Sequence, residues 1–247
     1  MEVKALEFYK NGYMKGAFAF GGSENNPYKE EILEASLQGY IINTGSEVIL
    51  VDTGMPMETP DFDGKPGQML YTGEKVNNFV DALKVAGYEL NDIDKVVITH
   101  KHPDHTGELR LFSNAKIYIS EVEANAMGLE GENIVKVKFE SGCYKNFDKS
   151  EKIAEGIYML PAVGHTKGNS ILVVEDKELS FMLHGDITYT DKALKENMLS
   201  MVFEDKEEAA KTLNIIREFI RNNKTIYLGT HSPESLKSLS DRRLMEI

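Results

Sequence analysis

The pattern of apolar and polar positions predicts several strands and a helix in the first half of the chain. Residues 36–43 and 47–52 are two β-rich runs, and the turn-forming triplet 44–46 between them predicts a β-hairpin. Residues 75–86 place apolar side chains at helical spacing, and residues 95–99 (KVVIT) have the composition of a buried strand. We therefore expect a hairpin, a helix and a strand in this order.

The second half repeats this order of strands followed by a helix. A strand at residues 115–119 leads into a helix at 121–127 that Ser120 can cap. Asp205 can cap a longer amphipathic helix at 206–221. Further strands are expected at residues 156–160, 170–174, 180–184 and 225–228. This order favours an α/β fold in which two sheets pack together and helices cover their outer faces, a four-layer αβ/βα sandwich.

Length and composition favour a single globular domain over residues 1–247. The hydrophobic fraction is 41%, and no linker, low-complexity tract or short repeat divides the chain. The 28 Lys and Arg residues are outnumbered by 40 Asp and Glu residues, which gives a formal net charge of −12. Because neutralised phosphates supply much of the affinity for nucleic acid, this balance argues against a nucleic-acid partner.

The sequence lacks the features of an exported or membrane protein. Its apolar stretches are far shorter than the ~20 residues that span a bilayer, so we expect no membrane association. The N-terminus has no apolar signal core, and a single cysteine, Cys143, excludes an internal disulfide. We therefore expect a cytoplasmic protein.

Residues 99–107 (THKHPDHTG) concentrate candidate metal ligands directly after a predicted strand. An extended backbone puts His100 and His102 on one face, where both imidazoles can converge on one ion. Asp104 and His105 fall on the following turn, within reach of a second ion. Imidazole nitrogens and carboxylate oxygens are the ligand types that suit zinc and related divalent ions. Three adjacent imidazoles would repel one another when protonated, and a metal removes this cost.

Three further candidate ligands follow predicted strands elsewhere in the chain. His165 stands in GHTKGNS, Asp186 in HGD and His231 in GTHSP. A lone histidine is more often a half-buried structural residue than a ligand, but the cluster at 100–105 makes these three positions the natural remaining ligands. We interpret His184 as a packing or outer histidine, although its period-2 relation to Asp186 leaves open that it points at the site.

These motifs, in this order, resemble the metallo-β-lactamase superfamily. They are VDTG at 51–54, THxHxDHxG at 99–107, GHT at 164–166, GD at 185–186 and GTH at 229–231. The resemblance implies the metallo-β-lactamase fold and a supporting role for Asp52 beside the ligands, without contact to the ions. It further implies a two-metal centre, with one ion held by His100, His102 and His165, the other by Asp104, His105 and His231, and both bridged by Asp186.

The tetrapeptide DITY at residues 186–189 resembles the N-acyl-homoserine lactonase branch of this superfamily. In that branch the tyrosine, here Tyr189, lies beside the metals and assists ring opening. The long early segments 16–35 and 55–74, which could roof a pocket, are similar as well. Glu108 departs from the usual double glycine after the DH pair. An alternative role for Tyr189 is a half-buried ring that anchors the loop after a strand.

The resemblance implies a hydrolase that opens a lactone or ester in a small-molecule substrate, in the first place an N-acyl-homoserine lactone, which is a quorum-quenching activity. Two divalent ions, zinc first and manganese, iron or cobalt as alternatives, would hold a hydroxide that attacks the carbonyl. Asp104 can aim that hydroxide, and Tyr189 can donate to the developing oxyanion or the leaving oxygen. The apolar residues of 198–203 either line an acyl pocket or pack as core. A homodimer is compatible with the sequence.

Three other enzyme classes and one class of binding protein compete with this interpretation. A glyoxalase-II-like thioesterase is expected to carry a C-terminal helical domain, whereas 16 residues follow His231 here. An RNA or phosphodiester hydrolase needs basic clamps, which the net charge disfavours. A di-iron oxygen or nitric-oxide reductase resembles HxExDH, and His102 stands at the acidic position. A non-catalytic metal-binding scaffold protein would not need all seven ligand positions.

Overall fold

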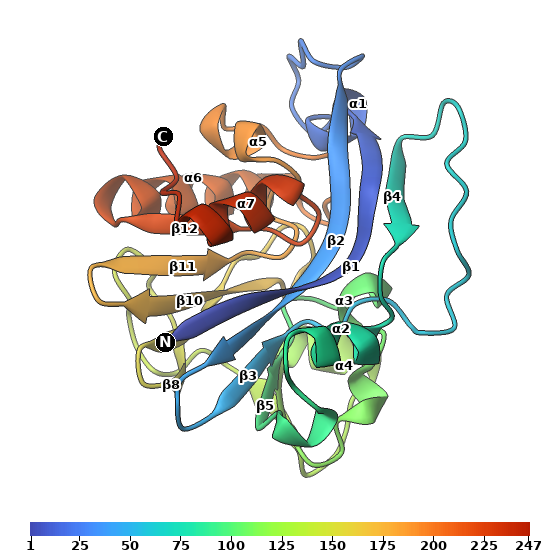
Figure 1. Ribbon diagram of the computed structural model, residues 1–247. Coiled ribbons are helices and arrows are strands. Elements are labelled where there is room, and N and C mark those ends of the chain that lie inside the picture. Colours follow the sequence, from blue (N-terminus) through green and yellow to red (C-terminus); the bar gives the residue numbers. More distant parts are fainter.

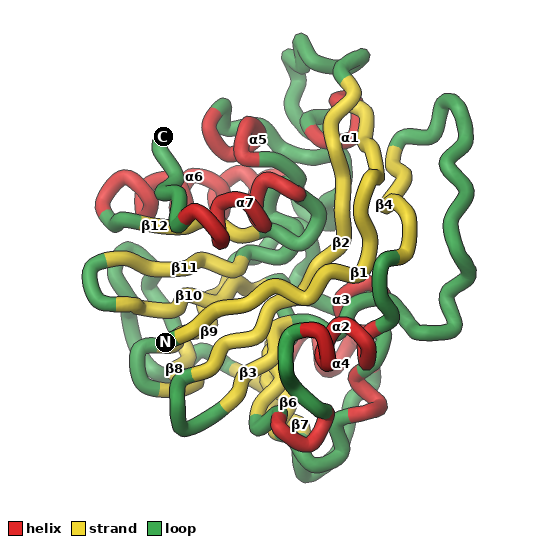
Figure 2. Tube along the Cα trace, in the orientation of Figure 1, coloured by secondary structure: helices red, strands yellow, loops and turns green.

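The computed structural model describes residues 1–247 and contains two β-sheets (Figure 1, Figure 2). The first sheet has seven strands in the order β4-β1-β2-β3-β5-β6-β7, and the second has five in the order β12-β11-β10-β9-β8. The strands of the first sheet are β1 (Glu2–Lys15), β2 (Ile32–Asn43), β3 (Val48–Val51), β4 (Leu70–Lys75), β5 (Lys95–Val97), β6 (Lys116–Ser120) and β7 (Ile134–Val137). Those of the second sheet are β8 (Glu151–Ala154), β9 (Ile157–Pro161), β10 (Ser170–Asp176), β11 (Leu179–Leu183) and β12 (Thr225–Leu228).

Helices cover the outer faces of both sheets. The α-helices are α1 (Gly16–Ala19), α2 (Phe79–Val85), α3 (Pro103–Thr106), α4 (Glu121–Met127), α5 (Asp191–Lys195), α6 (Lys206–Asn222) and α7 (Pro233–Asp241), and the 3-10 helices are η1 (Leu90–Asp92) and η2 (Leu109–Leu111). Helices α2 and α4 pack on the first sheet, and α6 packs on the second (Figure 1). No helix of the chain combines the length and the apolar character that a membrane crossing requires.

Alternating side chains of the central strands separate the layers of the core. In β10, Leu172 packs between the two sheets, whereas Ile171 points to the opposite face and packs with α6. In β2, Ile42 faces the other sheet and Ile41 faces α2 and α4. Because these strands are buried on both faces, they are nearly continuous apolar runs in the sequence. The predicted four-layer αβ/βα sandwich is therefore confirmed.

Local sequence signals predicted several elements correctly. The β2–β3 hairpin pairs antiparallel, with Tyr40 opposite Val51. Helix α4 begins after Ser120, whose hydroxyl accepts a backbone N–H of the first turn, and α6 begins after Asp205, whose carboxylate does the same. The predicted bounds of β12 also agree with the structure. The hairpin and the two helices each depend on a turn or cap formed by neighbouring residues.

The helix predicted at residues 75–86 is shorter in the structure, and this prediction was wrong at its start. Helix α2 begins at Phe79 because the Asn78 side chain caps it by accepting a backbone N–H of the first turn. Lys75 instead ends β4, and Val76, which we expected on the apolar stripe, is 39% exposed. The cap at Asn78, and not the apolar spacing, therefore determines where α2 begins.

Strand β1 is a long element that the hydrophobic pattern does not predict. Its pairing with β2 shifts register between Glu7 and Tyr9 and again between Tyr9 and Gly12. Such bulges break the period-2 alternation, so that the adjacent Phe8 and Tyr9 are both buried. Beyond the sandwich, β1 and β2 continue as an arm that carries α1, and β4 pairs with β1 along this arm (Figure 1).

Candidate metal centre

The seven candidate ligands come from loops and from the short helix α3, which meet at one end of the sandwich. Strands β11 and β12 run parallel, so their carboxyl ends open on the same side, which is where ligands bind in α/β sheets. The ligands are His100 after β5, His102 just before α3, Asp104 and His105 in α3, His165 between β9 and β10, Asp186 after β11, and His231 after β12.

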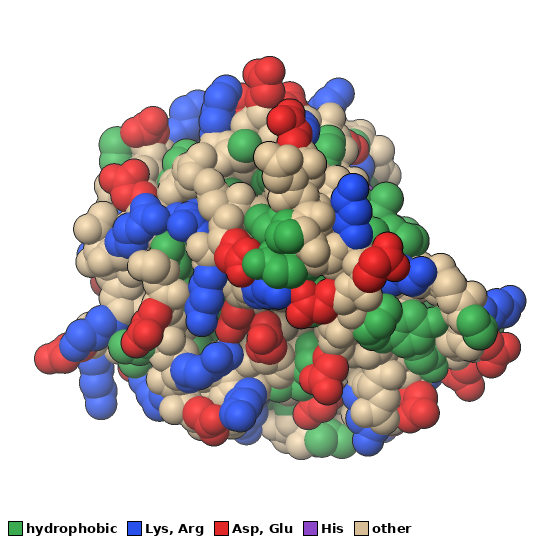
Figure 3. Space-filling view, turned by 90° about the horizontal axis from the view of Figure 1, so that it is seen from above, with side chains coloured by type: hydrophobic (Ala, Val, Ile, Leu, Met, Phe, Trp, Pro, Cys, Tyr) green, Lys and Arg blue, Asp and Glu red, His purple; other side chains and the backbone are tan.

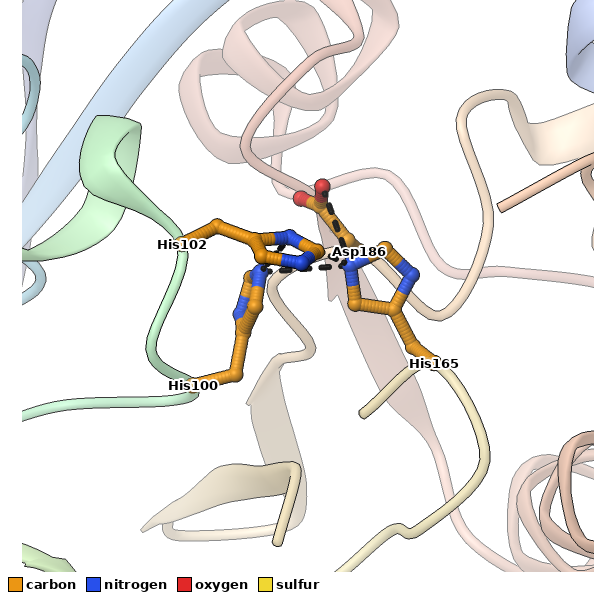
Figure 4. Close-up of side chains that lie close together, drawn as sticks. All are labelled: His100, His102, His165 and Asp186. Carbon is orange, nitrogen blue, oxygen red and sulfur yellow. Dashed lines mark hydrogen bonds and ion pairs between the residues drawn. The ribbon is translucent and has the colours of Figure 1, made fainter. Parts of the chain in front are cut away.

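Three imidazoles and a carboxylate form the first ligand group (Figure 4). His100 Nε2 lies 3.0 Å from His102 Nδ1 and 3.2 Å from His165 Nε2, and the latter two nitrogens are 3.1 Å apart. Asp186 Oδ2 lies 3.6 Å from His165 Nε2. Nitrogens that bind one tetrahedral zinc ion at ~2.0–2.1 Å are about 3.3 Å from one another. The first group therefore has the dimensions of a single ion site.

Asp104, His105 and His231 form the second ligand group. His231 Nε2 lies 3.2 Å from Asp104 Oδ2, and His105 Nε2 lies 3.9 Å from the same oxygen. Asp186 reaches this group as well, because its Oδ1 is 3.2 Å from His105 Nε2 and its Oδ2 is 3.3 Å from His231 Nε2. One carboxylate thus contacts both groups, which is the arrangement that a bridging ligand requires.

Hydrogen bonds to backbone carbonyls fix which ring nitrogen of two histidines faces the centre. His165 Nδ1 donates to the Val202 carbonyl at 3.2 Å, and His231 Nδ1 donates to the Ser36 carbonyl at 3.3 Å. A carbonyl only accepts, so the Nε2 atom of each neutral ring carries the lone pair and points into the centre. The sequence does not reveal either acceptor, because a backbone carbonyl has no side-chain signature.

Asp52 contacts the ligands from outside the two groups, as the family resemblance implies. Its Oδ2 accepts from His105 Nδ1 at 2.7 Å and from the Thr99 hydroxyl at 2.9 Å, and its Oδ1 accepts from the Thr99 backbone N–H at 2.8 Å. Thr99 Oγ1 in turn accepts from His100 Nδ1 at 3.0 Å. The Asp52 carboxylate therefore orients one imidazole of each group, one directly and one through Thr99.

The buried polar atoms of the centre fit a bound cation. His105 Nε2 and Asp186 Oδ1 are buried without a hydrogen-bond partner, although they lie 3.2 Å apart. Burial lowers the pKa of His165 to about 4, which keeps this imidazole neutral. Burial also disfavours the imidazolium of His231, but Asp186 and Asp104 raise its pKa to about 10. The carboxylates thus stabilise positive charge in the second group, and divalent ions can supply this charge in place of protons.

Tyr189 lies at the edge of the centre with its ring and its phenol both held. Its Oη donates to Asp186 Oδ2 at 2.9 Å, and its ring stacks on His231 with centroids 5.3 Å apart. Phe18, in the early segment 16–35, packs edge-on against the same ring at 4.9 Å. Burial and the Asp186 carboxylate raise the pKa of Tyr189 well above its usual value, so the phenol remains a donor. Tyr189 therefore combines the two roles considered for it: its ring anchors the loop, and its phenol contacts a candidate ligand.

His184 belongs to neither ligand group. Its buried ring stacks on Tyr227 with centroids 3.7 Å apart. A Cβ atom on Gly229 would lie 2.6 Å from this ring, so the glycine leaves room for the imidazole. These contacts agree with the packing role that we predict for His184.

The apolar run 198–203 packs close to the first ligand group. Leu199 and Val202 border a cavity of about 10 Å³ that also touches His165. This volume is that of about one water molecule and is too small for an acyl chain. Met198 and Leu199 are buried, as expected of core residues, whereas Met201 is 47% exposed, so only the start of this run packs as core.

Sequence comparisons identify relatives over nearly the whole chain. The family model of the metallo-beta-lactamase superfamily matches residues 38–231. An N-acyl homoserine lactonase of a Bacillus species is 28% identical over 241 residues, which cover 95% of each chain. N-acyl homoserine lactonase AiiA of Bacillus thuringiensis subsp. kurstaki is 27% identical over 245 residues, which cover 96% of this chain and 97% of AiiA.

Solved structures share the fold. An N-acyl homoserine lactone hydrolase with the product N-hexanoyl-L-homoserine bound at its catalytic metal centre has a TM-score of 0.72 and 24% identity, with 96% of this chain and 97% of that chain covered. AidC, a dizinc quorum-quenching lactonase, has a TM-score of 0.68 and 16% identity over 94% of this chain and 90% of that chain. The family match includes all seven candidate ligands, from His100 to His231. The chain therefore belongs to the metallo-β-lactamase superfamily, as a metal-dependent hydrolase.

Proposed function

We propose that this chain hydrolyses the ring ester of N-acyl-homoserine lactones at a centre of two divalent metal ions. Two relatives that bear the name lactonase match at least 95% of the chain. The structural observation that carries the proposal is the phenol of Tyr189, 2.9 Å from Asp186. It places a neutral donor beside the carboxylate that contacts both ligand groups, where the oxygen atoms of an ester would lie during hydrolysis.

The assignment of ligands follows the two groups. We assign one ion to His100, His102 and His165, the other to Asp104, His105 and His231, and we assign Asp186 to both. Zinc is the metal we propose, because imidazole and carboxylate ligands suit it, and manganese, iron and cobalt are the alternatives. When bound, two such ions supply Lewis-acid polarisation of a carbonyl and activation of water near neutral pH.

Asp104 is the ligand carboxylate nearest to solvent. Its side chain is 22% exposed, against 3% for Asp186, so water and substrate approach from the Asp104 side. Asp104 can accept a hydrogen bond from the attacking water and orient its oxygen toward the lactone carbonyl carbon. The water oxygen bonds to that carbon, the ring C–O bond breaks, and a proton passes to the leaving alkoxide to give the hydroxy acid.

Besides Asp104, Tyr189 is the second side chain to which we assign a catalytic role. Its phenol can donate to the carbonyl oxygen as negative charge develops or to the alkoxide as it leaves. His231 stacks on the ring and Phe18 packs edge-on against it, so the ring is held before substrate binds. Only the O–H bond, which points to Asp186 in the substrate-free chain, has to turn toward the substrate oxygen.

The proposal extends to the setting of the enzyme. A small molecule is the partner we propose, since basic and acidic side chains are interspersed on the face shown in Figure 3 and no basic stripe is visible there. A cytoplasmic location is supported by the single cysteine, Cys143, which is not paired. We also propose that residues 1–247 form one domain. A homodimer is compatible with the sequence, and sedimentation analysis can distinguish it from a monomer.

A hydrolysis screen tests the substrate class. The protein, loaded with zinc or manganese, is assayed on N-hexanoyl-homoserine lactone, on thioesters and on phosphodiesters at equal concentrations. The proposed function requires kcat/KM to be highest for the lactone. Hydrolysis of thioesters or phosphodiesters without lactone opening would contradict the lactonase proposal and leave the metal centre intact.

A further inference from the structure

Glu123 is a fully buried carboxylate in α4 that belongs to neither ligand group. Its exposed fraction is 0%, and its backbone N–H donates to the hydroxyl of Ser120, the cap of the helix. A buried carboxylate is unfavourable unless hydrogen bonds compensate for lost hydration. The partners of Glu123 therefore indicate what the chain gains from placing a charge there.

Both carboxylate oxygens of Glu123 bind backbone N–H groups of ligand-bearing loops. Glu123 Oε2 accepts from the Lys101 N–H at 2.8 Å, and Oε1 accepts from the Gly168 N–H at 2.7 Å. Lys101 stands between His100 and His102, and Gly168 follows His165 by three residues. One side chain thus joins the two loops that supply all three imidazoles of the first ligand group.

The contact at Gly168 is close enough to require glycine. The Ser120 hydroxyl donates to the Gly168 carbonyl at 2.6 Å, so the start of α4 binds this peptide from two sides. A Cβ atom on Gly168 would lie 2.5 Å from Ser120 Oγ and 2.7 Å from Glu123 Oε1. The backbone of the His165 loop is therefore pressed directly onto α4.

A second carboxylate joins the same two loops at the surface. Glu204 Oε1 pairs with Lys101 Nζ at 2.7 Å, and Glu204 Oε2 accepts from the Lys167 N–H at 2.8 Å. Because the side chains of Lys101 and Glu204 are 27% and 32% exposed, solvent weakens this link relative to the buried one.

We infer that Glu123 is a positioning residue that aligns the His100–His102 loop with the His165 loop so that their three imidazole nitrogens meet on one ion. The observed separations of 3.0–3.2 Å between these nitrogens depend on the relative placement of the two loops. This inference rests on the metal centre of the proposed function and is independent of the lactone substrate.

The test measures zinc affinity at the first ligand group alone. The background variant Asp104→Ala/His231→Ala removes two ligands of the second group and leaves it only His105 and the shared Asp186, so that the remaining zinc reports on the first group. Glu123→Gln keeps one acceptor and turns an amide NH₂ toward the other N–H, which separates the two loops. We expect zinc affinity, measured by competition with a chromophoric chelator, to fall about 10- to 100-fold, as for other residues that support metal ligands. The visible spectrum of the cobalt-loaded protein should change as well.

Glu108→Gln in the same background is the matched control. Glu108 is equally buried, but its carboxylate accepts from Met57 N–H and Arg110 and touches neither loop of the first group. We expect it to lower the melting temperature and to leave zinc affinity at this group unchanged. Glu204→Gln, which is partly exposed and less disruptive to folding, should lower the affinity in the same direction as Glu123→Gln but by less.

The outcomes separate this inference from the proposed function. If the wild-type chain binds no divalent metal, the metal centre itself is wrong. If the wild type binds metal, and Glu123→Gln and Glu204→Gln both keep the background affinity and cobalt spectrum, Glu123 serves only stability and the inference is overturned. A loss of affinity in Glu108→Gln equal to that in Glu123→Gln would also overturn it.

Discussion

Replacing Tyr189 by phenylalanine removes only the phenolic oxygen from the edge of the metal centre. The ring keeps its stacking on His231 and its edge contact with Phe18. The bond lost is the one from Oη to Asp186 Oδ2 at 2.9 Å. Because Asp186 retains His231 and His105 within 3.3 Å, the metal ligands should stay in place.

The expected loss of rate follows from the kind of bond that the phenol makes. The raised pKa of Tyr189 keeps the phenol protonated, so it can donate to an oxygen that gains charge in the transition state. Such a hydrogen bond contributes on the order of 1–3 kcal/mol, which corresponds to a ~5- to 150-fold fall in kcat/KM. Most of the catalysis should remain, because the ion ligands are untouched.

The assay compares three proteins on N-hexanoyl-homoserine lactone, with metal content and melting temperature measured for each. Tyr227→Phe is the control, since it also deletes a buried hydroxyl, one that lies 3.0 Å from the Thr188 hydroxyl and outside both ligand groups. The control should lose stability and keep its kcat/KM. A Tyr189→Phe enzyme with full activity, or one that has lost metal in proportion to its activity, would refute the role of the phenol as donor.

Three further predictions concern the metals, the catalytic carboxylate and pH. Elemental analysis after reconstitution with zinc or manganese should find about two ions per chain, because seven ligands exceed the needs of one tetrahedral ion; a value near zero would remove the site assignment. Asp104→Asn should lower kcat/KM strongly while the free energy of unfolding changes little, as rate and melting measurements can show. A variant that keeps the kcat/KM of the wild type would exclude the catalytic role of Asp104. Burial and Glu234 raise the pKa of Asp191 to about 6, above its unfolded value of 3.8, so its contribution to stability is present below pH ~4 and is lost as pH rises through ~6. The free energy of unfolding, measured with urea at several pH values, should no longer show this loss in Asp191→Asn. A variant whose free energy of unfolding depends on pH as in the wild type would contradict the raised pKa of Asp191.

Signals that act over a few residues made part of the fold predictable. The cap at Asp205 and the turn at residues 44–46 each define an element through neighbouring atoms, and both elements were predicted correctly. Strand β1 is the opposite case, because two register shifts interrupt its alternation and its partners β2 and β4 are distant in sequence. The start of α2 at Phe79 similarly depended on the competition between a cap and an apolar pattern.

The candidate ligands were predictable because their chemistry is carried by side chains in short motifs. The structure brings all seven together in two groups that share Asp186. The groups that orient the imidazoles were less accessible to sequence reasoning, since Ser36 and Val202 act through backbone carbonyls. Glu123 has a side chain suited to its contacts, but its partners Lys101 and Gly168 lie 22 and 45 residues away, and no local pattern links them.

Glu108 shows how a departure from the family motif is accommodated beside the ligands. A Cβ atom on the preceding Gly107 would lie 2.2 Å from backbone of the segment after β3, so that glycine is sterically required. Glu108 has no such restriction: its N–H donates to the Thr53 hydroxyl at 3.0 Å, and its buried carboxylate accepts from Met57 N–H at 2.5 Å and from Arg110 at 3.2 Å. The side chain thus ties the segment after β3 to the end of α3. Only the first position of the usual glycine pair therefore needs glycine in this chain, and the second can carry a carboxylate without displacing a ligand.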